Sequence, residues 1–477
     1  MLTTAQRLLT SPDSGARDVG DPKYRLLHAL MAILWSQFQY RTGQAQASLE
    51  SARSALGWLP PGEEYVASYA KQWLAAYNQA IGQEDVALAQ LQQALRDHST
   101  HRNSAARLLF AQAWVYLAAG KLPQAEQTAR HLLRLAQDAD LALSHSWAHW
   151  LLGLVSYEWN KLDESVYHFS VVIANQHLAS LWAVQEAMCV LAAAYHAQGL
   201  GTRVRETARS MLEWVQEQHN MPQLMTAYAF CGRLALLQDE VEEASQWLEM
   251  AGNPEVRGPM MFFEDPPITT AWMLLAKGDV PSVARGQALL TQLLQHVEAI
   301  HSTRKTIQVL ALQAWAYNLQ GRLTEALDVL ECALARARPA GFIRTFADLP
   351  KLSALLQELR KRRKASHAPD SKLDAYLQRI LVAMNPPASQ AVSTENLMRQ
   401  EGIEPLTDRE LQILRLLDKD LTNKEIAREL MVTPGTVKVH TTNVYRKLSV
   451  NNRRAAVTLS KALGLLAANQ ATTPQLR

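Results

Sequence analysis

The sequence predicts an all-α protein in which a long array of paired helices, an α-solenoid, precedes a small four-helix domain. Three observations lead to this prediction. A phrase of about 40 residues recurs along the first 340 residues, the last 77 residues carry consecutive helix-start signals, and Gly plus Pro account for only 39 of 477 residues. A chain of this length, 48% hydrophobic, is too long for one compact core. We therefore expect a repeat array followed by a separate domain.

Composition and cysteine usage narrow the class of protein. Cys189, Cys231 and Cys332 lie far apart in apolar segments, so they predict neither a disulfide framework nor a metal site and suit a reducing cytoplasm. No apolar run approaches the ~18 residues of a membrane span. The leader, residues 1–24, is too polar for a signal peptide and is expected to be poorly structured. We expect a cytoplasmic protein with no membrane partner.

The repeated phrase is an apolar helix, a Gly or polar break, and a small residue five positions later in a second apolar helix. It is clearest at residues 113–133, 153–173, 232–252 and 314–334. Successive anchors are 38 to 43 residues apart, and they are Ser48, Ala87, Ala125, Ser165, Val204, Ala244, Val283 and Ala326. A second small residue lies twelve positions before the four clearest anchors, at Ala113, Gly153, Gly232 and Ala314. Small residues at both places let two antiparallel helices approach closely.

Each such helix pair buries its apolar face only against its neighbours, so about eight pairs are expected to stack over residues 25–350. The pattern resembles the tetratricopeptide repeat, and its long period resembles the variant in MalT-like transcription activators. The resemblance implies a right-handed superhelix whose concave face is built by the first helix of each pair. Seven side chains would then lie in or near this groove and bind a ligand or a partner protein, namely Tyr69, Arg107, Trp147, Trp150, Tyr157, Arg233 and Trp315. The alternative for each is ordinary packing.

Two further features of the repeat region bear on ligand binding. His145 and His149 are four residues apart on a helix, but no third ligand lies at a matching offset, so no metal site is expected. The glycine cluster at residues 199–206 lacks the Lys of a phosphate loop and predicts a turn between helices.

Residues 351–401 are expected to form a helical linker. The phrase GFIRTFADLP at Gly341–Pro350 resembles the stretch that follows the repeats in MalT-like regulators. Helices are predicted over Lys351–Lys364 and Asp374–Met384, and residues 385–404 are the best linker candidate. The basic run at residues 360–364 would either contact phosphate or form a solvated helix end whose cations suit the helix dipole.

The C-terminal domain, residues 402–467, has three capped helix starts. Thr407 with Glu410, and Thr422 with Glu425, have the spacing of capping boxes, and Thr433 precedes a Pro suited to a first helical position. A short turn between two helices, the second of them basic, is typical of a DNA-binding helix-turn-helix. Residues 468–477 are expected to be a flexible tail.

Charge is uneven along the chain. Residues 401–477 contain 12 Lys/Arg and 8 Asp/Glu, a net charge of +4, whereas the other 400 residues carry 36 and 37. No acidic residue follows Glu429, so the cations after it are unopposed along the sequence. This half of the domain is expected to attract the phosphates of double-stranded DNA.

The third helix of the domain, about residues 434–448, separates into two faces. The core face is predicted at Val437, Thr441, Val444 and Leu448. Lys438, Val439 and Thr442 are predicted to read base edges in the major groove. Thr433, Thr436, Arg446 and Lys447 are predicted to contact phosphates.

This segment resembles the LuxR/GerE family of DNA-binding domains. The match is carried by residues 406–417, 422–448 and 451–466. The resemblance implies a helix-turn-helix from Asn423 to Thr442, base contacts from its recognition helix, and a final helix, about Arg453–Leu466, that contacts a second copy. One departure is Asp420, where the family usually has Gly; Asp tolerates the left-handed conformation of a turn.

We therefore expect a sequence-specific DNA-binding transcription regulator, and not an enzyme, whose repeats sense a ligand or dock a partner protein. It would bind DNA as a homodimer, with RNA polymerase a candidate partner and no cofactor. MalT-like regulators usually begin with an ATP-binding module, and this chain has no phosphate-loop motif. It is either a regulator without that module or the C-terminal half of a longer one. The alternative function is a repeat scaffold whose terminal helix-turn-helix binds protein.

Overall fold

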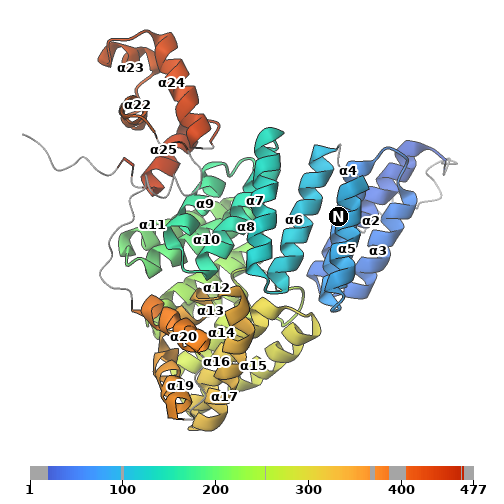
Figure 1. Ribbon diagram of the computed structural model, residues 1–477, viewed down its shortest axis with the longest axis vertical. Coiled ribbons are helices and arrows are strands. Elements are labelled where there is room, and N and C mark those ends of the chain that lie inside the picture. The colour runs from blue at the N-terminus through green and yellow to red at the C-terminus, as the bar shows by residue number, and fades with distance from the viewer. Residues whose placement is uncertain are drawn as a thin grey trace, which may run out of the picture. The chain divides into compact units, whose positions relative to one another are not determined.

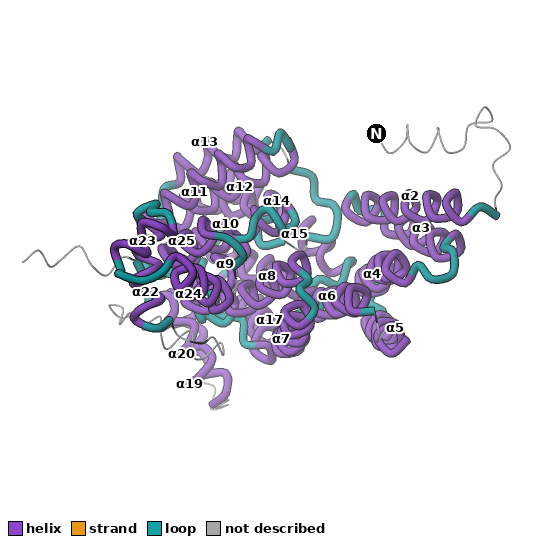
Figure 2. The backbone as a smooth tube through the Cα atoms, turned by 90° about the horizontal axis from the view of Figure 1, so that it is seen from above, coloured by secondary structure: helices purple, strands orange, loops and turns teal. Residues whose placement is uncertain are grey.

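The computed structural model describes residues 20–97, 101–252, 254–260, 262–365, 371–385, 404, 406–448, 450–463 and 465–466. The described residues form helices and loops without a strand (Figures 1 and 2). The repeat helices are α2 (Pro22–Arg41), α3 (Ala45–Trp58), α4 (Glu64–Ala80), α5 (Glu84–Asp97), α6 (Arg102–Ala118), α7 (Leu122–Asp138), α8 (Ala142–Glu158), α9 (Leu162–Ala174), α10 (Leu181–Ala197), α11 (Gly201–Glu217), α12 (Met221–Leu237), α13 (Val241–Ala251), α14 (Pro266–Lys277), α15 (Val280–Ala299), α16 (Thr303–Leu319) and α17 (Leu323–Ala337). The all-α prediction is confirmed.

These helices follow one another as eight pairs within the described part of residues 22–337, in agreement with the repeat period. Every predicted anchor lies in the second helix of its pair, and each is at most 6% exposed. The small residues are therefore where the paired helices meet, because a larger side chain at these places would push the helices apart.

One residue in the left-handed conformation ends the first helix of each pair, five positions before the anchor. Their φ angles lie between 60° and 80°, and the residues are Gly43, Gly82, Gly120, Asn160, Gly199, Asp239, Gly278 and Gly321. Glycine adopts this conformation without a Cβ clash, and Asn and Asp tolerate it best among other residues. The Gly or polar break of the sequence phrase is thus the turn of each pair, including Gly199 in the glycine cluster.

Gly153 of α8 shows how closely the two helices of a pair approach each other. A Cβ atom built there would lie 2.9 Å from the ring of Phe169, and Ser165 Oγ donates a hydrogen bond to the Gly153 carbonyl at 3.0 Å. Ser48 makes the equivalent contact in the first pair, where its hydroxyl donates to the Ser36 carbonyl at 2.9 Å. Because the side chains at these positions are small, the two helix backbones lie close together, and the serine hydroxyl bonds to a carbonyl of the paired helix.

The chain divides into two compact units, which are described separately. One comprises residues 1–151 and 224–385, and the other residues 152–223 and 386–477. The first unit continues after the repeats with η1 (Arg338–Ala340), α18 (Arg344–Ala347), η2 (Pro350–Leu352), α19 (Ser353–Ala365) and α20 (Ser371–Met384). The two linker helices were predicted within about three residues of their observed starts. The linker candidate at residues 385–404 lies almost entirely outside the described residues.

Two cations of the basic run at the end of α19 are paired with acids on α17. Arg362 lies 2.8 Å from Asp328 and 2.9 Å from Glu331, and Arg363 also pairs with Glu331. Of the two interpretations, the helix end fits better than a phosphate contact, because two of the cations already have acidic partners.

The second unit ends in α22 (Asp408–Asp418), α23 (Asn423–Glu429), α24 (Pro434–Lys447) and α25 (Arg453–Ala462). Apolar residues of α22, α23 and α24 form one buried cluster that includes Ile413, Ile426 and Val437. The final helix was predicted to reach Leu466 but ends at Ala462, with Leu463 as its cap. Among the described residues, no helix is long and apolar enough to cross a membrane.

Candidate nucleic-acid interface

Side-chain caps fix the start of each helix in the C-terminal domain. Both capping boxes are present: Thr407 N–H donates to Glu410 Oε2 at 2.8 Å, and Thr422 N–H donates to Glu425 Oε2 at 2.7 Å. Thr433 Oγ1 accepts from the Thr436 N–H at 3.2 Å and caps α24. These caps satisfy amide groups that the helices leave unpaired, so they define the turn between α23 and α24.

The two predicted faces of α24 are observed. Val437, Val444 and Leu448 are fully buried and Thr441 is 7% exposed. On the opposite side Lys438, Val439 and Thr442 are exposed, and Val439 keeps 60% of its surface in solvent. An apolar side chain this exposed on a helix held by its other face is available for contact with another molecule.

The cations that follow Glu429 are mostly opposed in space, which corrects the view from the sequence. Arg446 lies 2.9 Å from Glu404, and Lys461 lies 2.7 Å from Asp418. Arg453 donates to the carbonyls of Leu417 and Leu421. Carboxylates and carbonyls from earlier in the chain thus lie next to these cations, although no acidic residue follows the cations in the sequence.

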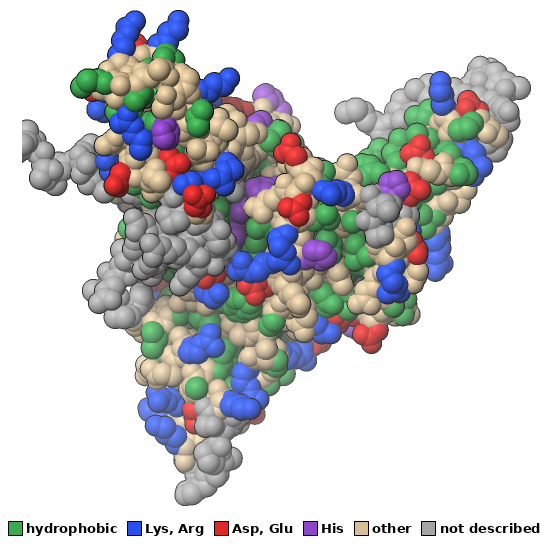
Figure 3. Space-filling view, turned by 45° about the horizontal axis from the view of Figure 1, so that its top comes forward, with side chains coloured by type: hydrophobic (Ala, Val, Ile, Leu, Met, Phe, Trp, Pro, Cys, Tyr) green, Lys and Arg blue, Asp and Glu red, His purple; other side chains and the backbone are tan. Residues whose placement is uncertain are grey.

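Lys438 and Arg454 differ from these cations. Both are exposed, and neither has an acidic partner within 4 Å among the described residues. Figure 3 shows Lys and Arg side chains standing out from the surface of the C-terminal domain. The outer side of α24 therefore carries Lys438, an exposed cation without such a partner, beside an apolar and a hydroxyl side chain, and also the exposed Arg446, which pairs with Glu404.

Lys447 has a different setting from the other predicted phosphate contacts. Thr433 and Arg446 are exposed and Thr436 is half-buried, whereas the Lys447 side chain is 4% exposed. Its ammonium lies 2.9 Å from Glu410 and 3.1 Å from Glu404. Burial lowers the pKa of Lys447, but the two carboxylates outweigh it and raise that pKa overall. The charge of Lys447 is therefore neutralised by carboxylates of its own domain.

Glu410 is the other half of this buried pair. Burial raises the pKa of Glu410, but the Lys447 ammonium and the Thr407 N–H outweigh it, so that pKa lies below its ordinary value of 4.5. One carboxylate thus caps α22 and ties it to α24.

The family departure at Asp420 is accommodated by the turn between α22 and α23. Asp420 has φ of 58°, the left-handed conformation that glycine adopts more readily. Its side chain is 99% exposed and lies 3.8 Å from Arg453. Asp420 therefore adopts the left-handed conformation itself.

Three of the predicted groove residues in the repeat region come together. The Arg107 guanidinium carbon lies 3.1 Å from the Tyr69 ring centroid and 4.8 Å from that of Trp147. Arg107 also donates to the Tyr65 hydroxyl at 3.1 Å and is only 3% exposed. The arginine therefore sits inside an aromatic enclosure of its own chain.

The other groove candidates are buried as well. Trp150 and Tyr157 are at most 1% exposed, and Trp315 and Arg233 are 5% exposed. Arg233 lies 3.7 Å from Glu264 and 3.5 Å from Asp348. Burial raises the pKa of Glu264 even though Arg233 opposes that rise. The sequence did not reveal this buried ionic group, although Asp348 belongs to the singled-out phrase Gly341–Pro350.

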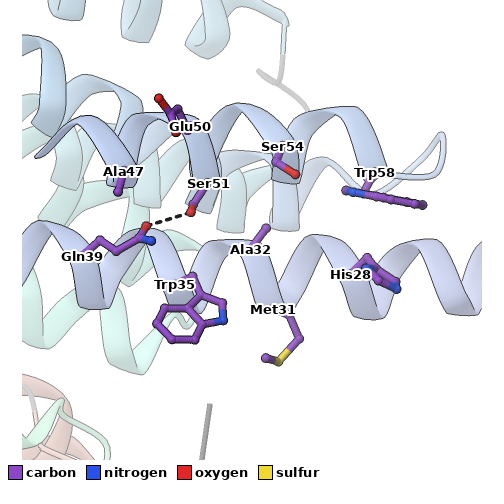
Figure 4. Close-up of a pocket in the computed structure, with 10 residues that line it drawn as sticks. All are labelled: His28, Met31, Ala32, Trp35, Gln39, Ala47, Glu50, Ser51, Ser54 and Trp58. Carbon is purple, nitrogen blue, oxygen red and sulfur yellow. Dashed lines mark hydrogen bonds between the residues drawn. The ribbon is translucent and has the colours of Figure 1, made fainter. Parts of the chain in front are cut away.

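The first repeat pair carries a surface hollow that the sequence did not indicate. A cavity of about 560 Å³ lies between α2 and α3 (Figure 4). Trp35 and Met31 line it from α2, and Ser51 and Trp58 from α3. Apolar side chains on α2 are also exposed, among them Leu27, Leu30, Leu34 and Phe38. Among the described residues, no group of three or more His, Cys, Asp or Glu is placed to hold a metal ion.

Comparisons with known proteins match two segments of the chain. Residues 29–362 match the family model described as the MalT-like TPR region, and residues 404–460 match the model described as bacterial regulatory proteins, luxR family. A solved structure of a monomeric IFIT1 mutant with m7Gppp-AAAA is 18% identical, with a TM-score of 0.38, over 70% of this chain and 66% of that one. The chain thus spans just under two thirds of that structure. The p58(IPK) TPR domain is 12% identical, with a TM-score of 0.18, over 79% of this chain and 99% of that one.

Proposed function

The chain belongs to the family with a MalT-like TPR region, and because it also carries a LuxR-family domain it is a DNA-binding transcription regulator; we propose that α24 enters the major groove of its DNA site. In this proposal Lys438, Val439 and Thr442 face base edges. The Lys438 ammonium donates to guanine O6 or N7, and Val439 meets a thymine methyl group.

The observation that carries the proposal is the division of α24 into a buried and an exposed face. A helix whose core side is anchored by Val437, Val444 and Leu448 presents its other side at a fixed orientation. Thr442 Oγ1 donates to the Lys438 carbonyl at 3.0 Å, so its proton is engaged and its oxygen remains able to accept a hydrogen bond. An exposed cation, a methyl-bearing side chain and an acceptor on one helix face suit the mixed surface of a major groove.

Phosphate contacts are proposed for Thr433, Thr436 and Arg446. Thr433 caps α24 and Thr436 lies in its first turn, where backbone dipoles favour an anion. Arg446 is exposed, and its one acidic partner among the described residues is the exposed Glu404, so a phosphate is able to replace that partner. For Lys447 we propose a structural role, because moving its ammonium to a phosphate would leave Glu410 buried without a cation.

We further propose that the repeat region senses a ligand or docks a partner protein, and that the regulator binds paired half-sites as a homodimer. The hollow between α2 and α3 and the exposed apolar side chains of α2 support a docking role. RNA polymerase is a candidate partner because the protein is a transcription regulator.

Selection of bound duplexes from a random library tests the DNA proposal. The full chain should enrich one sequence, and the Lys438→Ala variant should lose discrimination at one base pair of it. Repeating the selection with cell extract reports whether a ligand or partner changes affinity. The scaffold alternative predicts no enrichment and no retention on a DNA column at moderate salt.

A further inference from the structure

The outer face of α9 differs from the outer faces of its sister helices. Positions two, six and nine after the anchor face outward in the second helix of a pair. In α7 they are Gln127, His131 and Arg134, all exposed, and in α11 they are Glu206, Ser210 and Glu213, all exposed. The equivalent side chains of α5, at Ala89, Gln93 and Arg96, and of α17, at Asp328, Cys332 and Ala335, are exposed too. In α9 these positions are Tyr167, Val171 and Ala174, and they are 2%, 1% and 8% exposed.

Helix α9 differs from these helices in the types of residue at the three positions as well as in their burial. Uncovered, α9 would present an apolar stripe at spacings of four and three residues, where α7 and α11 present polar side chains. Such a stripe gains free energy only when another apolar surface removes it from water. The sequence of α9 therefore indicates that another apolar surface packs on its outer face, whereas α7 and α11 need no such contact.

The cover is the last helix of the DNA-binding domain. Tyr167, Val171 and Ala174 belong to one buried cluster with residues of α24 and α25, including Leu459 and Leu463. Leu465 and Leu466, which follow α25, pack against the same cluster. Helices α9 and α25 lie side by side in both views, within the same compact unit (Figures 1 and 2).

A polar contact adds to this apolar one. Arg203 of α11 lies with its Nη2 atom 3.5 Å from the Lys461 carbonyl near the end of α25. The last carbonyls of a helix have no partner within it, and a guanidinium suits the negative end of the helix dipole. Two repeat helices, α9 and α11, thus contact α25.

We propose that the outer face of α9 is a docking site for α25 of the same chain, which holds the DNA-binding domain on the repeat region. Docking leaves the outer face of α24 open but occupies the apolar side of α25. A second copy of the domain cannot use that side while α9 covers it. Release from α9 therefore frees α25 for pairing and strengthens binding to paired half-sites. This consequence rests on the proposed function, whereas the docking itself does not.

The test gives α9 the outer face of α7 in the full chain. The triple variant Tyr167→Gln, Val171→His and Ala174→Arg should release α25, because three polar side chains would replace its apolar partner. Its matched control places the same three residues on α11, as Glu206→Gln, Ser210→His and Glu213→Arg, where they replace polar side chains that are already exposed.

Hydrogen–deuterium exchange is the first measurement. Amide exchange in α25 should rise about tenfold or more in the α9 variant and stay at the wild-type rate in the control. Unchanged exchange in α10 shows that the repeats remain folded. If α10 also exchanges faster, the single variant Ala174→Arg, at the end of α9, takes over the test. Wild-type exchange of α25 in a folded α9 variant overturns the docking.

DNA affinity is the second measurement, with the duplex found by library selection. The α9 variant should bind paired half-sites about tenfold or more tightly than the wild type, with equal affinity for a single half-site. Equal affinity of both proteins for paired half-sites overturns the control of pairing by docking. If neither protein binds any duplex, the proposed function fails, and the exchange measurement still decides the docking.

Discussion

Two lysines at opposite ends of α24 show how much the surroundings decide a residue's role. Lys438 is exposed, without an acidic partner within 4 Å among the described residues, whereas Lys447 is 4% exposed and pairs with Glu410. In our proposal the first meets DNA, whereas the second pairs with a carboxylate of another helix, α22. Each residue therefore predicts a different failure when it is changed.

Lys438→Ala should weaken binding to the selected duplex by roughly 1–3 kcal/mol and relax base choice at one position, because a hydrogen-bond donor to a base edge is lost. Gel-shift titrations with cognate and scrambled duplexes measure both effects. Lys419→Ala is the matched control, since Lys419 is exposed at the end of α22. Unaltered discrimination in Lys438→Ala would remove this residue from the base-reading set.

Lys447→Met should lower the free energy of unfolding of the DNA-binding domain by about 3 kcal/mol, because the Glu410 carboxylate stays buried without its cation. Denaturant unfolding followed by exchange or fluorescence measures the loss. A variant with wild-type stability and a salt slope of DNA binding reduced by about one unit would instead make Lys447 a phosphate contact.

The same ion pair predicts a pH dependence with two limbs. The pKa of Glu410 is lowered, so its contribution to stability is present above its ordinary value of 4.5 and is lost as pH falls through the lowered value. The pKa of Lys447 is raised, so its contribution is present below its ordinary value of 10.5 and is lost as pH rises through the raised value. Glu410→Gln should flatten the acid limb in thermal melts. A wild-type acid limb in that variant would contradict the assignment.

Asp420→Gly should stabilise the domain by about 1 kcal/mol, because the left-handed conformation strains a residue with a Cβ atom. The lost contact with Arg453 is long and exposed, and offsets little of this gain. The melting temperature measures the change. Lys419→Gly is the control, because Lys419 has φ of −80° and gains nothing from glycine. A lower melting temperature for Asp420→Gly would show that its side chain matters more than the strain.

At the scale of elements, the helix pairs depend on side chains that are small where two backbones meet. Ser165 and Gly153 bring α8 and α9 together through one hydrogen bond and the ring of Phe169. Such contacts tolerate no added bulk unless the neighbour moves. The repeated positions are therefore defined by the small size of the side chain that fits there as well as by its hydrophobicity.

Gly153→Ala should destabilise the repeat region by roughly 1–3 kcal/mol, because its methyl group would lie 2.9 Å from the Phe169 ring. Gly57→Ala is the matched control in α3, where a Cβ atom meets nothing within 4 Å and helix propensity favours alanine. Calorimetry of the full chain compares the two. Equal or higher stability of Gly153→Ala would mean that the Phe169 ring or the two helices shift at little cost to make room for the methyl group.

At the scale of the whole molecule, the second compact unit joins part of the repeats to the DNA-binding domain. Helix α25 serves as the wall of the small domain on one side and as the cover of α9 on the other. A change in the repeats that moves α9 therefore reaches the domain through direct packing.

Binding to paired half-sites should involve two copies of the chain per duplex, because a symmetric site presents the same surface twice. Sedimentation of the complex with the selected duplex measures the stoichiometry. A duplex carrying one half-site should bind a single copy. One copy on paired half-sites at saturation would contradict the homodimer proposal.

The sequence predicted the repeat anchors, the turn residues, the three helix caps and the faces of α24, since each depends on residues close together along the chain. It left open whether Trp150 and Arg233 face a groove or pack in the interior, and both are buried. It also treated Arg446, Lys447 and Lys461 alike as unopposed cations. Their partners Glu404, Glu410 and Asp418 lie 37 to 43 residues earlier, beyond the reach of local patterns.

By itself, then, the order of residues determined where helices begin, which of their sides are apolar and which family the chain resembles, because periodicity and capping act over a few residues. Tertiary structure alone decided which charges are neutralised, which aromatic side chains are enclosed, and that Tyr167 and Val171 of α9 meet α25. Those outcomes depend on which surfaces come into contact, and burial assigns a charge or an apolar stripe its energy only once its neighbours are in place.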